Sequence, residues 1–416
     1  MPQSIVITGL GAISPLGSSL DLYWDGLLAG RSGISRITQF DASDLPCQIA
    51  GEVPDFTVED YMERKEARRN SRCAQMGLAA AMQAVKDAGL PDTMPDPERA
   101  GIVFATAVGG VEKLAEGIEV LRTAGPSRLN PFMLPGTIPN LAAFLISRQF
   151  QCIGPNFTIT TACAAGTQAV GEGVELIRRG AADICIVGGT EAQIRDYTIA
   201  GFCAMGALPT NFNDEPEKAS RPFDKRREGF LFSEGAGALV LETRQHAEAR
   251  GARIYAEIIG HASSFDGYHV AAPHPDGTGA KNAMRWALRD AGLRPDQLDH
   301  INTHGTSTPI NDPLETRSIK QVFGEHAYKI AVNSTKSMIG HPMGAAGALE
   351  AIACALTLYH DIVPPTVNLE DPDPECDLNY TPNHAVKQVV RTAMSNSFGL
   401  GGQNACIVLK KNGVEL

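Results

Sequence analysis

The stretch TTACAAG, residues 160–166, stands between two runs of different hydrophobic period. An apolar, β-branched run at 157–160 leads into it, and an amphipathic run at 167–179 leads out of it. The pattern predicts a strand, a tight turn and a helix, with Cys163 at or near the first helical turn. Free N–H groups and the helix dipole favour an anion there, so we expect a thiol shifted towards the nucleophilic thiolate. The alternative is a buried cysteine that packs as a small apolar side chain.

The composition is that of an ordinary globular chain. Of its 416 residues, 43% are hydrophobic and 20% are charged, which is enough for two or more domains around a large core. We find no apolar run of transmembrane length and therefore expect no membrane span. The net charge of −11 argues against a nucleic-acid binder.

Cysteine usage and the first residues bear on the compartment. Nine cysteines, an odd number, are scattered without CxxC or Cys/His metal spacing. This predicts reduced thiols, a cytoplasmic location and no metal site. Residues 1–4 run directly into the strand-like segment 5–7, which leaves no place for a signal or transit peptide.

Strand-like and helix-like segments alternate along the chain, and the pattern repeats. In each half, a strand and a Thr-containing turn precede a helix rich in small residues, after Cys163 in the first half and after His341 in the second. This order predicts a duplicated α/β unit with halves at 1–250 and 251–416. Chemistry in such sheets collects where strands end and helices begin, which is where Cys163, His304, Lys336 and His341 lie.

Two histidines have unusual surroundings. His304 lies in NTHGTSTP (302–309) and His341 lies in KSMIGHPMGAAG (336–347), both among small residues, glycine and proline. A single histidine is most often structural, and we interpret the other eight in that way. A cysteine and two histidines at like positions are more specific, because covalent catalysis needs a nucleophile with polar partners.

Four motifs in order carry a family resemblance: TAC (161–163), THGTST (303–308), KSMIGH (336–341) and NSFG (396–399), with RPFD (221–224) and EGAG (234–237) between them. Together they resemble the β-ketoacyl-acyl-carrier-protein synthases, and within these the elongating type II branch, the KAS II group. The resemblance runs from about residue 3 to 410. It implies a thiolase fold, an α/β architecture of two similar halves in five α-β-α-β-α layers, and a homodimer.

The resemblance also implies a reaction. Cys163 would take an acyl chain from acyl carrier protein as a thioester, and His304 and His341 would assist decarboxylation of malonyl-carrier protein. The carbanion would then attack the thioester and lengthen a fatty acyl or polyketide-like chain by two carbons. Two neutral imidazole N–H donors would suit the developing enolate. The backbone N–H groups of Cys163 and Leu400 would form a second oxyanion hole, and no cofactor is implied beyond the phosphopantetheine of the carrier.

Lys336 has a supporting role by the same resemblance. Alone it would be taken for a surface lysine, but the family places it in a buried charge network beneath the site. Its expected partners are Asp312, Glu315 and Glu350, because a buried lysine needs such groups to stay charged.

Substrate contacts follow from the resemblance as well. Thr306 and Thr308 match hydroxyls that bind the pantetheine arm, although strand-end hydroxyls often hydrogen-bond locally. The basic run 63–72 is either a solvated face or a dock for the acidic carrier. The expected contacts are the arm at Thr306 and Thr308, the acyl chain at Val108, Phe202, Phe398 and Leu400, and the carrier at Lys65, Arg68 and Arg69.

The chain departs from the family pattern at a few positions. Leu400 stands where the family has a phenylalanine that gates the nucleophile, so we expect a looser gate that affects substrate choice more than chemistry. Ala271 and Ala272 replace a hydroxyl pair near the carrier phosphate, and Gly206 replaces a basic docking residue. These changes are compatible with a dedicated carrier in a specialised pathway.

Three alternative functions fit the sequence less well. A non-condensing partner subunit that sets chain length usually lacks the cysteine, which is present here. A degradative thiolase uses a second cysteine near its C-terminal end, but Cys406 lies in a strand-like run where packing is expected. An initiating condensing enzyme would carry one histidine and one asparagine instead of two histidines.

Overall fold

A computed structural model describes residues 4–416 of the chain. Its backbone forms one ten-stranded sheet with the strand order β10-β9-β13-β14-β8-β1-β7-β6-β4-β5, and two small two-stranded ladders. The first five strands of this sheet in chain order are β1 Ile5–Ile13, β4 Ala100–Ala105, β5 Asn156–Ile159, β6 Ile184–Glu191 and β7 Gly235–Thr243. The second five are β8 Ala256–Phe265, β9 His300–Asn302, β10 Ala331–Asn333, β13 Thr392–Phe398 and β14 Gln403–Lys411.

The two sets of five strands have the same topology. In the first set, β4 runs parallel to both β5 and β6, while β7 is antiparallel to β6 and β1. In the second set, β9 runs parallel to both β10 and β13, while β14 is antiparallel to β13 and β8. The sets meet where three residues of β1 pair with three of β8. The predicted duplication is therefore present in the strand order itself.

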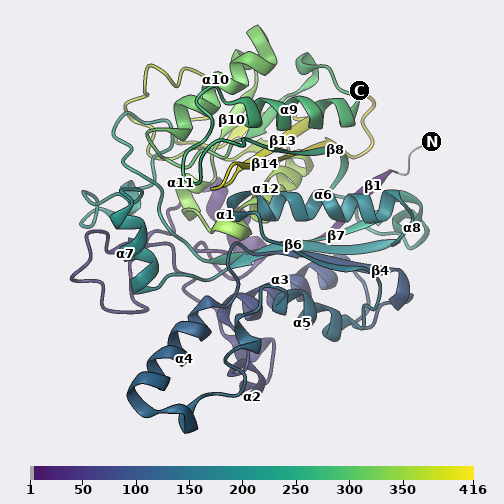
Figure 1. Ribbon diagram of the computed structural model, residues 1–416. Helices are drawn as coiled ribbons and strands as arrows, with labels where there is room; N and C mark the ends of the chain where they lie inside the picture. Colours follow the sequence, from purple (N-terminus) through teal and green to yellow (C-terminus); the bar gives the residue numbers. More distant parts are fainter. Residues whose placement is uncertain (1–3) are drawn as a thin grey trace.

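Helices cover both faces of each set and complete five layers (Figure 1). One outer layer packs against the first set, the other packs against the second, and the central layer contacts both. The outer helices are α3 Arg72–Asp87 and α5 Leu141–Phe150 on one side, and α9 Thr278–Ala291 and α10 Asn311–Phe323 on the other. The central helices are α6 Ala165–Arg178 and α12 Ala346–His360. This arrangement confirms the expected thiolase-like layering.

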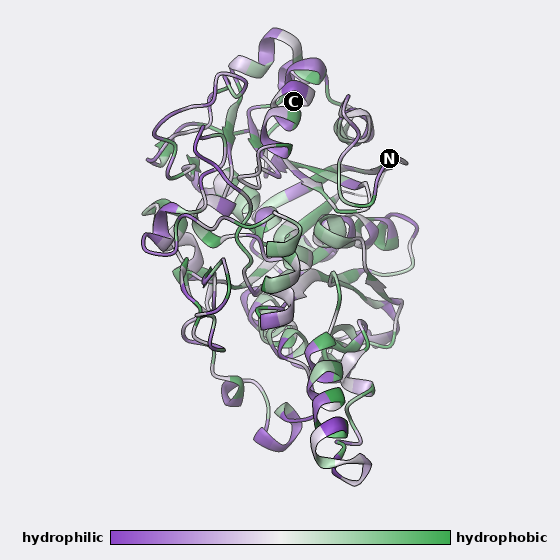
Figure 2. Cartoon of the chain, turned by 60° about the vertical axis from the view of Figure 1, so that its left-hand side comes forward, coloured by the Kyte–Doolittle hydropathy of each residue, from purple (hydrophilic) through white to green (hydrophobic). Residues whose placement is uncertain are grey.

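The remaining helices are shorter or lie at the periphery. They are α1 Leu20–Leu28, α2 Arg64–Ala67, α4 Val111–Ala124, α7 Asp196–Ala204, α8 Arg244–Ala249 and α11 Lys336–Ile339. Helix α4 projects from the lower end of the molecule and mixes hydrophobic and hydrophilic residues along its length (Figure 2). It lies outside the five layers and does not shape the sheet.

The stretch Met343–His360 corrects one expectation. By length and composition it could cross a membrane, which corrects the expectation that the chain has no apolar run of transmembrane length. In the structure 89% of it is buried, and it contains α12, whose neighbours are α6 and strands of both sets. A core helix surrounded by protein is apolar all round for the same reason as a membrane helix.

Candidate active site

Cys163 lies where β5 passes into α6, as the sequence predicts. A 3-10 turn, Ala162–Ala164, runs directly into α6, and Cys163 is its middle residue. Ala162 has a φ of 49°, which is unusual for a residue with a side chain. Such backbone strain costs about 1–3 kcal/mol and persists only where the surroundings enforce it.

Close packing of α6 against α12 holds this strained turn in place. A Cβ atom added at Gly166 would lie 2.8 Å from the backbone nitrogen of Ala348, and one at Gly347 would lie 2.3 Å from that of Thr167. Only glycine permits this approach. The N-terminal ends of the two central helices are thereby held together, which brings segments some 180 residues apart in sequence to one place.

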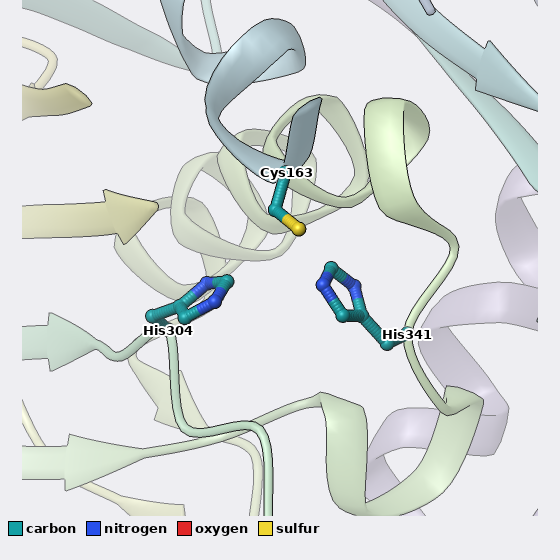
Figure 3. Close-up of side chains that lie close together, drawn as sticks. All are labelled: Cys163, His304 and His341. Carbon is teal, nitrogen blue, oxygen red and sulfur yellow. The ribbon is translucent and has the colours of Figure 1, made fainter. Parts of the chain in front are cut away.

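His304 and His341 face the sulfur of Cys163 from two other elements (Figure 3). His304 follows β9 by two residues, and His341 follows α11 by two residues. A ring nitrogen of each histidine and Sγ of Cys163 all lie within 4.8 Å of one another. The two ring centroids are 5.4 Å apart, and the planes are nearly perpendicular at 83°. The three predicted residues therefore converge on one point.

Both imidazoles are held neutral. Burial lowers the pKa of His304 and of His341 well below 6.5, and the nearby Lys336 ammonium lowers both further. Within the described chain, Nδ1 of His304 and both ring nitrogens of His341 have no hydrogen-bond partner. Buried polar atoms without partners are rare and call for a ligand. Neutral rings with free nitrogens fit the expected role of N–H donors to an enolate.

The expectation of a resting thiolate at Cys163 is wrong. Burial raises the pKa of the Cys163 thiol to about 11. The backbone N–H of Leu400, the Lys336 ammonium and the N–H of Cys163 itself act in the opposite direction but do not outweigh burial. Both N–H groups predicted for the oxyanion hole are thus near enough to the sulfur to lower the pKa of the thiol. The helix terminus helps an anion formed during reaction more than it ionises the free thiol.

Lys336 forms a buried ion pair with Glu350 of α12, and both side chains are almost fully excluded from solvent. Burial raises the pKa of Glu350, and the Lys336 charge opposes that shift. Glu350 also accepts a hydrogen bond of 3.4 Å from the Ser397 hydroxyl. This pair is the part of the predicted charge network that the structure brings together.

Glu315 and Asp312 act separately from Lys336. The Glu315 carboxylate accepts the backbone N–H groups of His304 at 2.9 Å and of Gly305 at 2.8 Å, so it fixes the loop that carries His304. Burial raises its pKa to about 7. Asp312 instead accepts the N–H of Phe223 at 2.9 Å and lies 3.9 Å from the Arg227 guanidinium. The resemblance grouped three acids with Lys336, and within the described residues Glu350 is the one that pairs with it. Asp312 and Glu315 are linked to each other instead, because the Asn311 side-chain amide donates to both.

A cavity of about 390 Å³ opens onto Cys163, His304 and His341. Its wall includes Thr306 and Thr308, whose hydroxyls are 3.0 Å apart. Other expected residues on this wall are Phe398, Leu400, Gly206, Ala271 and Ala272. Its only carboxylate or ammonium side chains within the described chain are Glu228 and Asp266. The cavity is thus a mainly apolar passage that ends at the cysteine.

Two of the four residues expected at the acyl chain, Val108 and Phe202, do not line this cavity. Phe202 packs with Phe230 and Phe232, at ring separations of 5.3 and 5.5 Å, in the apolar cluster that contains Cys163. It lies behind the cavity wall. Val108 is 47% exposed and is absent from the wall, so within one chain it is not in a position to contact an acyl group in the cavity.

The basic patch, Lys65, Arg68 and Arg69, is exposed on and just after α2. The Arg69 guanidinium lies 4.6 Å from the centre of the Phe132 ring. Helix α2 is at the lower end of the molecule, whereas α7 and the start of α10, which flank the cavity, lie to the left and above (Figure 1). One chain does not bring the patch to the cavity.

Sequence reasoning missed two residues of this site. Phe230 packs edge-on against His341 at 5.5 Å between ring centroids and lines the cavity. Glu191, the last residue of β6, is fully buried behind Cys163. A glutamate that ends a strand is usually solvated, so no local signal separates it from a surface residue. Cys406 was placed correctly in a strand, where its thiol donates to Asn396 Oδ1 at 3.1 Å, away from the cavity.

Cys163, His304 and His341 also offer one sulfur and two nitrogen ligands of the kind that zinc prefers. Their spacing along the chain gave no sign of such a set, because the fold alone brings them together. The expectation of no metal site remains a prediction.

Comparisons with known proteins agree with this geometry. The model of the β-ketoacyl synthase N-terminal domain matches residues 3–247, and that of the C-terminal domain matches 255–370. The chain is 49% identical over 409 residues to the 3-oxoacyl-[acyl-carrier-protein] synthase 2 of Synechocystis, with 98% of both chains covered. It is 47% identical to the protein of the same name from Coxiella burnetii, with 98% of this chain and 99% of that one covered.

Among solved structures, "The ishigamide ketosynthase/chain length factor" superposes with a TM-score of 0.92 at 39% identity, over 99% of this chain and 100% of that one. The chain therefore belongs to the β-ketoacyl synthase family, in which the predicted KAS II-like branch matches the curated relatives. The family membership also confirms the expected class of enzyme, an acyltransferase of the condensing type.

Proposed function

We propose that this protein is a 3-oxoacyl-[acyl-carrier-protein] synthase that elongates acyl chains by decarboxylative condensation. The convergence of one thiol and two neutral imidazoles at the closed end of an apolar cavity carries this proposal. The roles of the individual residues follow from their positions.

Acyl transfer is the first step. The Cys163 sulfur attacks the thioester carbonyl of the acyl-carrier, the bond to the carrier sulfur breaks, and the thiol proton leaves with that sulfur. The N–H groups of Cys163 and Leu400, which lie close to the sulfur, stabilise the oxyanion that forms there. The raised pKa of the thiol means that this proton moves during attack, and the neutral imidazoles are the bases within reach.

Condensation is the second step. Malonyl-carrier loses carbon dioxide, and the electron pair of the broken bond forms an enolate whose oxygen accepts the N–H groups of His304 and His341. The enolate carbon attacks the Cys163 thioester, and the cysteine sulfur leaves and regains a proton. Neutral donors suit this step, because they stabilise the enolate more than the uncharged thioester. Thr306 and Thr308 hold the pantetheine arm along the cavity wall.

The carrier protein is the proposed partner. A solved structure with a TM-score of 0.89 at 34% identity, over the whole of both chains, is described as a "type II PKS acyl-carrier protein in complex with its ketosynthase bound to the hexaketide". We assign Lys65, Arg68 and Arg69 to contact with an acidic carrier. Both substrates arrive on that carrier, so the reaction uses no further cofactor. The protein would act in the cytoplasm.

We further propose a homodimer with halves 1–250 and 251–416 in each chain. Within residues 4–416, strand β5 is the outermost strand of the first set and pairs with β4 alone. Exposed apolar side chains lie on this strand, just before it and on the helix α5 that packs against it: Phe157, Ile153 and Phe144. An apolar surface next to an open sheet edge is typical of a subunit interface. Light scattering tests this, with a monomer in dilute solution as the contrary result.

The proposed function is tested with purified protein, acyl-carriers of several chain lengths and malonyl-carrier. A β-ketoacyl-carrier product two carbons longer is expected, and its yield against chain length reports the preferred substrate. Fatty acyl chains are favoured, because identity to the relatives named for 3-oxoacyl synthesis exceeds that to the ishigamide structure. No product with any fatty acyl-carrier would contradict the proposal.

A further inference from the structure

The duplicated fold contains a second copy of the Cys163 turn. The 3-10 turn Met343–Ala345 precedes α12 just as Ala162–Ala164 precedes α6. The first residue of each turn has a positive φ, 49° at Ala162 and 39° at Met343. Gly344 therefore occupies, in the second half, the position that Cys163 occupies in the first.

The two equivalent N–H groups have different neighbours. The N–H of Cys163 lies close to its own sulfur, and Cys163 lines the cavity. The N–H of Gly344 donates to Oε2 of Glu191 at 3.3 Å. The same oxygen accepts the N–H of Ala107 at 2.6 Å, and Oε1 accepts the Thr106 hydroxyl at 3.2 Å. The anion site of the second half is thus occupied by a carboxylate of the chain itself.

Glu191 occupies that site despite a cost. It is completely buried, and burial raises its pKa to about 7. The groups that oppose the shift are the N–H groups of Ala107 and Gly344 and the Thr106 hydroxyl. A buried carboxylate is retained when it organises groups that would otherwise be unpaired. The proposed reaction gives Glu191 no contact with a reacting atom.

Its contacts join two turns behind the nucleophile. Thr106 and Ala107 belong to the turn after β4, and Ala107 packs against the apolar cluster that contains Cys163 and Phe202. Met343, next to Gly344, belongs to the same cluster and lines the cavity. Each turn is fixed at a backbone N–H by one carboxylate. The wall on which an acyl chain would rest behind Cys163 is therefore held from the back by Glu191.

We infer that Glu191 is a positioning residue that sets the shape of the acyl-binding wall and thereby the chain-length preference. The inference rests on the proposed function and deepens it. It predicts that Glu191 controls formation of the Cys163 thioester with long acyl chains. It also predicts that Glu191 has little influence on malonyl decarboxylation, which involves His304 and His341 and no acyl chain.

The test compares two steps in one protein sample. Acylation of Cys163 is followed by intact-protein mass spectrometry with acyl-carriers from four to sixteen carbons, and decarboxylation is followed with malonyl-carrier alone. Glu191→Ala leaves both N–H groups unpaired and should slow acylation by long chains about tenfold or more. Decarboxylation should change less than about threefold, within the spread expected of a surface change. The ratio of the two rates cancels any loss of folded protein.

Glu191→Gln is the matched control, because its amide oxygen can still accept both N–H groups. It should restore the wild-type chain-length profile. If Glu191→Ala is insoluble, Glu191→Asp, whose carboxylate is one methylene shorter, replaces it. A parallel loss of both steps, or an unchanged profile in all variants, would overturn the inference. Failure of the wild-type protein to acylate Cys163 would instead overturn the proposed function.

Discussion

The two halves of the molecule share a strand order and a helix-initiating turn, yet only one half carries the nucleophile. In the first half, the N–H at the start of α6 faces a cavity. In the second half, the matching N–H at the start of α12 donates a hydrogen bond to the Glu191 carboxylate. The second half contributes the two histidines and the Lys336–Glu350 pair instead. The two halves thus have equivalent helix ends. The one that faces the cavity serves the reaction, and the one that binds Glu191 has a structural role.

This comparison shows where the physics of a helix terminus applies. The helix end alone does not ionise Cys163, since burial dominates its pKa. It offers N–H groups to a charge that arrives later, either an oxyanion or a fixed carboxylate.

The buried pair in the second half should matter most for stability. Lys336→Met leaves the Glu350 carboxylate buried without a cation, which should destabilise the fold by about 3–5 kcal/mol. Lys320→Met is the control, because Lys320 pairs with Asp377 at the surface and should cost below about 1 kcal/mol. Urea denaturation measures both variants. An equal decrease in the free energy of unfolding in both variants would mean that the Lys336–Glu350 pair does not stabilise the fold more than a surface pair does.

The two histidines should govern decarboxylation. Replacing His304 or His341 with alanine removes one donor to the enolate and should slow malonyl decarboxylation about 10²–10³-fold. Acylation of Cys163 should fall much less than decarboxylation in either single variant, because its oxyanion hole uses backbone N–H groups and the remaining imidazole can still take the thiol proton. His384→Ala changes an exposed histidine and serves as the control. If acylation fell as far as decarboxylation, the assignment of separate donors to the two steps would be wrong.

Leu400 should influence substrate choice. Its side chain lines the cavity beside Phe398, where the family has a flat aromatic ring. Leu400→Phe should shift the preferred chain length by a few-fold, since one pocket side chain is worth about 1–3 kcal/mol. Product analysis across chain lengths measures this, with the exposed Val389→Phe as a control for added aromatic bulk. An unchanged profile would exclude Leu400 as the gate.

The pH dependence should be slight near neutrality. Because the pKa values of His304 and His341 lie well below 6.5, both rings stay neutral as pH falls from 8 to 6. The rate of single-turnover decarboxylation, plotted against pH, should therefore show no titration with a midpoint near 6.5. A titration near 7 that Glu315→Gln removes would belong to that carboxyl, whose pKa is about 7. A titration near 6.5 that survives in Glu315→Gln would show that the imidazoles titrate.

Sequence alone predicted the strand, turn and helix around Cys163 and the duplication, because glycine, small residues and alternating apolar runs are local signals. It did not identify helices α7, α9 and α10. Helix capping does not explain the difference, because the predicted helices α6 and α12 also begin without a side-chain N-cap hydrogen bond.

The site was predicted in its members but not in its energetics. Cys163, His304, His341 and the Lys336–Glu350 pair were found from motifs, and the structure brings them together. The raised pKa of Cys163 and the role of Glu191 depend on burial by segments distant in sequence, which no motif records. The position of Val108 outside the cavity could not be predicted from the sequence, because the exposure of its side chain depends on how the chain packs.

Acylation of Cys163 tests the central claim most directly. Wild-type protein and Cys163→Ala are each incubated with acyl-carrier, and the intact mass is recorded before and after malonyl-carrier is added. The account predicts one acyl adduct on the wild-type protein, its loss as β-ketoacyl product forms, and no adduct on Cys163→Ala. An adduct that persists in Cys163→Ala, or none on the wild-type protein with any acyl-carrier, would contradict the assignment of the open helix end as the reaction site.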